Sequence, residues 1–301
     1  MRLTPKPPEI PDVGGFTAEN DLFELREFAE RLTNVLERAN EPLVVLLDGA
    51  WGSGKSVFSR QWAGLLRERG AQVIYFDAFQ NDHHEDAFVP ISAEILAAVE
   101  NVLGDKDQAT QRYVDGAKKV GVALAPLGLR IASRAATAGL LSLEDIEAGG
   151  ETLKSAIGEL AKESEKVVER AVAESLKKAK DSKETLQAYR NMLSELSSKM
   201  SEDAATEGPT LPTVVFVDEL DRCNPHFSLS IIERIKHLLS VENVCFVLVI
   251  HALQIEGHIE SAYGAKTDSR SYLEKFYTVR FSLTSMLEVS NKRKNLYINY
   301  L

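Results

Sequence analysis

The sequence predicts an α/β fold, a three-layer sandwich around a mostly parallel sheet, into which a long α-helical insertion is placed. Two apolar runs rich in β-branched residues, Pro42–Asp48 (PLVVLLD) and Val244–Ile250 (VCFVLVI), have the composition of strands buried on both faces. A glycine-rich turn and an amphipathic stretch, Val57–Arg69, follow the first run, and Val73–Phe79 (VIYFDAF) is predicted as the next strand. Strand, turn, helix and strand in this order form the βαβ unit of a parallel sheet.

Further elements of the same layered core are predicted on both sides of this unit. Thr213–Val217 (TVVFV) is a buried strand that ends in Asp218, Phe227–Leu239 is a helix, and Tyr277–Leu283 is a last strand. Before the first strand, Thr17–Ala39 is predicted as an amphipathic helix. Its apolar residues recur at helical spacing: Leu22, Leu25, Phe28, Ala29, Leu32, Val35 and Leu36.

The interval between Val102 and Pro212 is predicted to be helical rather than part of the sheet. Glu144–Ser201 is charged, and its apolar residues recur at alternating spacings of three and four, the heptad signature of a helical hairpin or coiled coil. The two sets are Leu153, Ile157, Leu160, Ser164 and Val167, then Leu186, Tyr189, Leu193, Leu196 and Met200. The predicted division of the chain is an N-terminal arm (1–20), a core (21–101 and 209–301) and a helical insertion (102–208).

The composition is that of a globular protein, with 44% hydrophobic and 27% charged residues. A formal net charge of −10 gives no clear signal for nucleic-acid binding. Cys223 and Cys245 lack CxxC spacing, so neither a disulfide framework nor a zinc site is predicted. Met1–Pro11 is rich in proline and lacks the apolar core of a signal peptide, so we expect a loose arm and a cytoplasmic protein.

The apolar, alanine-rich stretch Val120–Leu143 raises the question of membrane contact. A spanning helix needs about 20 apolar residues, but the charge-free run covers only Val120–Leu129 and is followed by Arg130 and Arg134. Each arginine at the centre of a membrane costs about 2.5–3.5 kcal/mol on insertion scales. We therefore expect a helix buried in protein, and peripheral membrane association is the less favoured alternative.

The turn Gly49–Ser56 (GAWGSGKS) matches the phosphate-binding pattern GxxxxGK[ST] of a P-loop and lies between a predicted strand and a predicted helix, as that pattern requires. Glycines allow backbone N–H groups to curl around a phosphate, and the helix N-terminus adds positive partial charge. Lys55 is predicted to act catalytically by neutralising the β- and γ-phosphates, and the Ser56 hydroxyl to bind Mg²⁺. The residues predicted to bind ATP are Gly49, Ala50, Trp51, Gly52, Ser53, Gly54, Lys55, Ser56, Val57 and His251.

Asp218 and Glu219 are the predicted catalytic carboxylates. Asp218, at the end of an apolar strand, is predicted to hold Mg²⁺ together with Ser56, and Glu219 to act as general base on the attacking water. His251 follows another strand, where it is either a polar sensor of the γ-phosphate or a residue that caps a loop. The histidines of Asn81–Asp86 (NDHHED) are assigned to a solvated loop, because no HExxH or CxxC pattern accompanies them.

Five stretches of the chain carry a family resemblance: LLDGAWGSGKS (Leu46–Ser56), FDAFQND (Phe76–Asp82), VFVDELDRCNP (Val215–Pro225), ERIKHLL (Glu233–Leu239) and YLEKF (Tyr272–Phe276). Together they resemble the KAP family of P-loop NTPases over about Asp21–Leu283. The resemblance implies an ATPase of the additional-strand class, with a helical insertion between its two nucleotide-binding motifs that in many members carries transmembrane helices. It also implies a role in conflict systems such as phage or plasmid exclusion, which is an analogy at the level of the family.

The chain departs from that family's pattern in three places. His251 stands where members usually have an aspartate, and the insertion lacks a clean membrane span. Relatives continue past the last core strand into a helical lid, so we expect a truncated or a short member. Arg222, Arg270 and Arg280 are the candidate arginine fingers, and Arg222 is alternatively a salt-bridge partner of the neighbouring acids.

These observations predict an ATPase that acts as a nucleotide-driven switch and uses its helical insertion for a protein partner or for self-association. The alternative is a nucleotide-gated scaffold with little or no turnover, which His251 and the absence of a lid favour. A small-molecule phosphotransferase fits less well, because the Asp218–Glu219 pair suits water as the acceptor. ATP is preferred over GTP, since the sequence has no NKxD-type guanine-reading motif.

Overall fold

The computed structural model describes residues 9–39, 41–84, 87–104, 107–124, 183–199 and 211–283. The chain divides into two compact units, Met1–Thr110 with Leu193–Leu301, and Gln111–Met192. The first unit contains the five strands described below and the glycine-rich loop. The insertion boundaries at residues 102 and 208 remain predictions.

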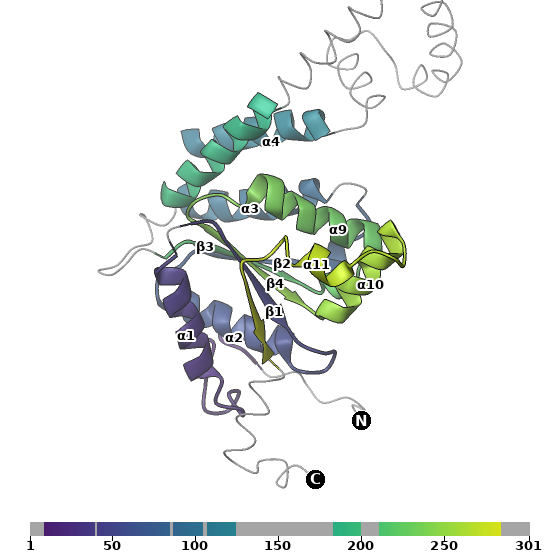
Figure 1. Ribbon diagram of the computed structural model, residues 1–301. Coiled ribbons are helices and arrows are strands. Elements are labelled where there is room, and N and C mark those ends of the chain that lie inside the picture. The colour runs from purple at the N-terminus through teal and green to yellow at the C-terminus, as the bar shows by residue number, and fades with distance from the viewer. Residues whose placement is uncertain are drawn as a thin grey trace, which may run out of the picture. The chain divides into compact units, whose positions relative to one another are not determined.

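Five strands form one sheet in the first unit (Figure 1). They are β1 (Leu43–Asp48), β2 (Val73–Asp77), β3 (Thr213–Asp218), β4 (Val244–Ile250) and β5 (Val279–Ser282). All neighbouring pairs are parallel, and the spatial order is β2-β3-β4-β1-β5. β4 therefore lies between β1, which precedes the glycine-rich loop, and β3, which ends in Asp218. The prediction of a parallel α/β sheet is confirmed.

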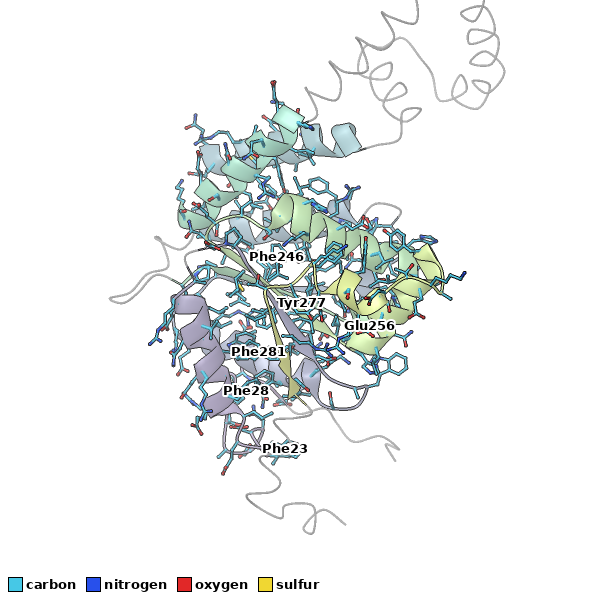
Figure 2. All side chains as sticks on the ribbon, viewed as in Figure 1. Phe23, Phe28, Phe246, Glu256, Tyr277 and Phe281 are labelled. Atoms are coloured by element: carbon cyan, nitrogen blue, oxygen red, sulfur yellow. The ribbon has the colours of Figure 1, made fainter. Side chains whose placement is uncertain are left out.

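Two helices cover one face of the sheet (Figure 1). α1 (Arg26–Glu37) and α2 (Lys55–Glu68) share a buried apolar cluster with side chains of β1, β3 and β4. Phe28 of α1 stacks on Phe58 of α2, with 5.4 Å between ring centroids. The same Phe28 ring meets Phe281 of β5 edge-on at 6.1 Å, as Figure 2 shows. Aromatic packing thus fixes both helices against the sheet.

Three helices cover the opposite face and complete the predicted three layers (Figure 1). They are α3 (Phe88–Leu103), α9 (Pro225–Arg234) and α10 (Ala252–Tyr263). The π-helical segment Ile235–Leu239 continues α9, and the short helix α11 (Ser269–Leu273) packs against α10. Helices on both faces explain why β3 and β4 are buried at every residue.

The N-terminal helix is shorter than predicted. It begins at Arg26 rather than at Thr17, because the Asp21 carboxylate accepts hydrogen bonds from the backbone N–H groups of Leu25 (2.7 Å) and Arg26 (3.1 Å) and so caps the first turn. Leu22, predicted on the apolar face of the helix, is exposed. The spacing of the apolar residues extended the predicted helix past the point where Asp21 binds the N–H groups of Leu25 and Arg26.

Other boundaries differ by smaller amounts. β2 ends at Asp77, two residues before the predicted end, and its backbone carbonyl accepts a hydrogen bond from the Asn81 side chain (2.9 Å) across the 3₁₀ turn Phe79–Asn81. α9 begins two residues early at Pro225, where the side chain of Asn224 caps the helix. The last strand begins at Val279 rather than at Tyr277.

The second unit contains most of α4 (Gln108–Leu124) and the beginning of a helix formed by residues 183–199. Within it, the Tyr113 and Tyr189 hydroxyls lie 3.1 Å apart. The predicted heptad residues from Leu186 to Leu196 fall on the helix of residues 183–199, and the remaining heptad residues lie outside the described ranges. None of the described helices is long and apolar enough to cross a membrane, and most of the predicted apolar stretch Val120–Leu143 lies outside the described residues.

Residues 12–16 of the predicted N-terminal arm lie against α2 at a glycine. The Gly14 N–H donates a hydrogen bond to the Gly64 carbonyl (2.9 Å). A Cβ on Gly64 would lie 2.6 Å from the Cα atom of Gly15 and 2.9 Å from the Pro11 carbonyl oxygen. Only a residue without a side chain allows this close approach of two backbones.

Gly64→Ala is expected to lower the free energy of unfolding by about 1–3 kcal/mol, because the clashing atoms are backbone atoms that cannot rotate away. Gly257→Ala, in α10, is the matched control, since nothing lies within 4 Å of its Cβ. That variant should gain about 0.5–1 kcal/mol from the lower entropy of its unfolded chain. Urea unfolding measures both, and equal stability of the two variants would contradict the expectation.

Candidate functional site

The glycine-rich loop connects the end of β1 to the start of α2. Gly52 (φ 78°) and Gly54 (φ 83°) adopt left-handed backbone conformations that other residues rarely take. Gly54 directly precedes the 14-residue helix α2, whose first turn contains Lys55, Ser56 and Val57. Free N–H groups and the helix dipole make such a terminus favourable for an anion. The local sequence therefore builds a phosphate cradle.

Asp218 of β3 brings a buried carboxylate to this loop. Its Oδ1 lies 3.2 Å from the Ser56 hydroxyl and accepts a hydrogen bond from the Glu219 N–H (2.8 Å). Its Oδ2 accepts a hydrogen bond from the Tyr75 hydroxyl at 2.6 Å, and Tyr75 also contacts Ser59 at 2.8 Å. Burial, with Asp218 nearby, raises the pKa of Tyr75 well above its usual range, so that the phenol stays protonated.

Glu219 lies next to the same hydroxyl. Its Oε1 is 3.4 Å from Ser56 Oγ, and its backbone is left-handed (φ 61°), an uncommon conformation for a residue with a side chain. Burial and the negative charge of Asp218 raise the pKa of Glu219, while the guanidinium of Arg222, 2.5 Å away, lowers it. Arg222 therefore pairs with Glu219. This is the salt bridge to a neighbouring acid that was predicted as the alternative to an arginine finger.

Lys55 contacts a carboxylate that the sequence analysis did not assign. Its ammonium lies 3.5 Å from Oδ2 of Asp221, and both side chains are buried. The same oxygen accepts a hydrogen bond from the Trp51 indole at 2.6 Å. Asp221 is the third acid of the string DELDR (Asp218–Arg222), and this string was the only indication of it in the sequence. Asp221 is buried on a 3₁₀ turn.

His251 follows β4 and lies beside the loop. Its ring meets Trp51 edge-on with 5.8 Å between centroids, and its Nδ1 has no hydrogen-bond partner among the described residues. Asp48, the last residue of β1, accepts hydrogen bonds from the Ala252 N–H (2.9 Å) and from Arg280 (2.7 Å). One candidate finger, Arg280, is thus paired with the carboxylate of the strand residue that directly precedes the loop.

The structure gathers the predicted site residues at one edge of the sheet. Gly49–Ser56, Asp218, Glu219 and His251 all lie at or after the carboxyl ends of β1, β3 and β4. The oxygen donors of Ser56 and Asp218 have the chemistry that Mg²⁺ prefers. Among the described side chains, no group of three or more His, Cys, Asp or Glu residues could hold a metal ion by itself.

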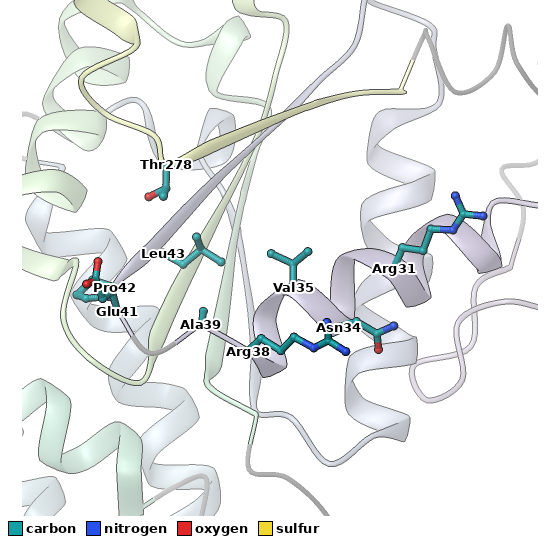
Figure 3. Close-up of a pocket in the computed structure, with 9 residues that line it drawn as sticks. All are labelled: Arg31, Asn34, Val35, Arg38, Ala39, Glu41, Pro42, Leu43 and Thr278. Atoms are coloured by element: carbon teal, nitrogen blue, oxygen red, sulfur yellow. The ribbon is translucent and has the colours of Figure 1, made fainter.

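A separate cavity of about 680 Å³ lies away from these residues (Figure 3). Arg31 and Arg38 of the α1 region line it together with Leu43, the first residue of β1, and Thr278, which precedes β5. It therefore opens near the amino ends of the strands, at the opposite end of β1 from the glycine-rich loop. None of the predicted site residues lines it.

Comparison with known families decides the assignment. The family description "KAP family P-loop domain" matches residues 25–296. The chain belongs to the KAP family. As a KAP P-loop protein it carries a nucleotide-binding domain, and the loop Gly49–Ser56 lies within the matched residues. No curated protein matches the chain.

Tyr75→Phe tests how the KAP domain holds its strand-end carboxylate. The variant removes the hydroxyl that donates to Asp218 and leaves a buried carboxylate oxygen without that partner. A hydrogen bond to a charged group contributes about 1.5–3 kcal/mol, so the free energy of unfolding should fall by about that amount. Urea unfolding measures the loss. Tyr263→Phe is the control, because its hydroxyl also donates to a carboxylate, that of Glu233 at 2.9 Å, but on an exposed residue where water replaces the lost partner; an equal or larger loss there would contradict the expectation.

Proposed function

We propose that this KAP domain binds ATP with Mg²⁺ and hydrolyses it. The observation that carries the proposal is the meeting of Ser56 with Asp218 and Glu219, at 3.2 and 3.4 Å, directly beside the loop that ends in Lys55. A hydroxyl, a metal-binding carboxylate and a second carboxylate at one phosphate cradle are the groups that hydrolysis of a phosphoanhydride requires.

Each residue has a role in this reaction. The backbone N–H groups of the loop and the Lys55 ammonium bind the β- and γ-phosphates, with Gly49–Val57 around them. Ser56 and Asp218 would hold Mg²⁺, which neutralises phosphate charge when bound. Glu219 accepts a proton from water, whose oxygen attacks the γ-phosphorus in line and breaks its bond to the bridging oxygen, so that ADP and phosphate leave. We assign the polar contact with the γ-phosphate to His251, whose ring lies beside Trp51 of the loop.

We further propose that hydrolysis switches the helical insertion, or a partner domain, between two states, in a conflict or phage-defence system. The family resemblance supports that context, and nucleotide switches commonly act on a neighbouring helical element. Protease digestion of Glu144–Ser201 should differ between the free chain and the chain with a non-hydrolysable ATP analogue. Equal digestion in both conditions would contradict the coupling.

A gated scaffold with little turnover is the second candidate. Two observations favour it: His251 replaces the aspartate usual in the family, and Arg280 is paired with Asp48 at 2.7 Å rather than free to reach a phosphate. Size-exclusion chromatography with and without ATP distinguishes the candidates, because a scaffold should assemble in only one nucleotide state.

The experiment that tests the proposed function is Mg²⁺-dependent phosphate release, combined with calorimetric measurement of ATP binding. Lys55→Ala is expected to weaken ATP binding by at least about tenfold, because a charge-assisted contact to phosphate is lost. Lys236→Ala removes an exposed lysine and is the control. Tight binding without release by the wild type would favour the scaffold, and unchanged binding by Lys55→Ala would contradict both candidates.

A further inference from the structure

Asp221 is a buried carboxylate that the proposed reaction does not use. Its side chain is 1% exposed, and it lies on the 3₁₀ turn Leu220–Arg222 that follows the two catalytic acids. One of its oxygens, Oδ1, has no hydrogen-bond partner in the described part of the chain. A buried carboxylate with an unpaired oxygen is costly, so its position beside the loop requires an explanation.

Both contacts of Asp221 are made by residues of the glycine-rich loop or its helix. Oδ2 lies 3.5 Å from the Lys55 ammonium and accepts the Trp51 indole hydrogen bond at 2.6 Å. The Lys55 side chain is only 9% exposed, so water screens this ion pair little. The charge of Asp221 therefore attracts the ammonium that phosphate needs and repels the phosphate itself.

We propose that Asp221 is a positioning residue that sets nucleotide affinity by competing with phosphate for Lys55. This inference rests on the proposed function, in which Lys55 binds the β- and γ-phosphates. Its consequence is weaker binding of both ATP and ADP, which allows ADP to leave after hydrolysis. Binding a nucleotide more tightly than turnover needs does not raise the rate of the chemical step.

Trp51 tunes this competition. Its indole N–H donates to the same oxygen that faces Lys55, and so draws part of the carboxylate charge away from the ammonium. Its ring is 56% exposed and rests edge-on against His251, which keeps the N–H aimed inward. Removing the N–H leaves Oδ2 to Lys55 alone and strengthens the ion pair. Loss of the N–H and loss of the carboxylate charge thus act on affinity in opposite directions.

The test measures dissociation constants of Mg-ATP and Mg-ADP by calorimetry, with kcat and KM from phosphate release. Asp221→Asn keeps an acceptor for the indole and removes the charge, so both dissociation constants should fall about tenfold, and KM and kcat should fall together as ADP release slows. Trp51→Phe keeps every charge, and both constants should rise about threefold. The double variant should have the same dissociation constants as Asp221→Asn, because no carboxylate charge then competes with phosphate for Lys55.

Glu94→Gln is the matched control, since it removes one exposed carboxylate from α3 and should leave both constants unchanged. Unchanged or raised constants in a folded Asp221→Asn variant, or unchanged or lowered constants in Trp51→Phe, would overturn the competition. If circular dichroism shows Asp221→Asn to be unfolded, Asp221→Ala takes its place, because it removes the same charge facing Lys55 and should lower both constants in the same direction. A wild-type chain that binds neither nucleotide would instead overturn the proposed function and, with it, this inference.

Discussion

Glu219→Gln is expected to lower the rate of phosphate release at saturating ATP by about 10²–10⁴-fold, while ATP binding survives. Glutamine matches the side chain in length but cannot accept a proton from water. Because the Glu219 carboxylate lies 3.4 Å from Ser56 Oγ, it is within reach of a water molecule at the proposed magnesium site. Phosphate release measures the rate, and calorimetry measures the binding.

The control for this variant is Glu242→Gln, the same chemical change on an exposed residue that precedes β4, at the end of that strand opposite the loop. It should leave the rate unchanged. If Glu219→Gln retained its rate to within about threefold, a different group would have to accept the proton, since a general base contributes far more. If ATP binding were lost as well, the variant would have disturbed the loop rather than the chemistry.

Trp62→Ala is expected to cause the largest loss of stability, about 3–5 kcal/mol, because it empties a fully buried site in α2. The indole ring meets Phe216 of β3 edge-on at 5.4 Å and stacks on Phe58 at 6.3 Å. Its N–H donates to the buried Thr33 hydroxyl of α1 at 3.0 Å. One side chain thus joins both helices of this layer to the sheet.

Urea unfolding followed by circular dichroism measures the loss. An unchanged slope of the unfolding free energy against urea concentration shows that unfolding is still cooperative. Leu253→Ala, on an exposed residue of α10, is the control and should change stability by less than about 0.5 kcal/mol. A loss below about 1 kcal/mol for Trp62→Ala would mean that the surrounding side chains collapse into the space, which would contradict the close packing described above.

The strands and the phosphate loop could be predicted from the sequence because the residues that form each of them are consecutive. β3 and β4 are runs of buried apolar residues bounded by polar turns, and both were located to within one residue. The loop required only its motif and the elements on either side of it. Such local patterns can be recognised without knowledge of the tertiary fold.

The contacts that complete the site could not be predicted, because they join residues far apart in the sequence. Tyr75 meets Asp218 across 143 positions, and Trp51 meets Asp221 across 170. In the sequence Tyr75 is one apolar strand residue among several, and Asp221 is one acid among three. The order of the strands decides which of them face each other, and no local pattern encodes that order.

The strand order also restricts how the chain can fold during synthesis. β1 pairs only with β4 and β5, and β2 pairs only with β3. Every partner of the first two strands therefore begins at or after residue 213, so the N-terminal two thirds of the chain contains no pair of its described strands that can hydrogen-bond to each other. A ribosome-bound chain of that length exposes two unpaired apolar strands, and we expect a chaperone that shields such segments to bind it.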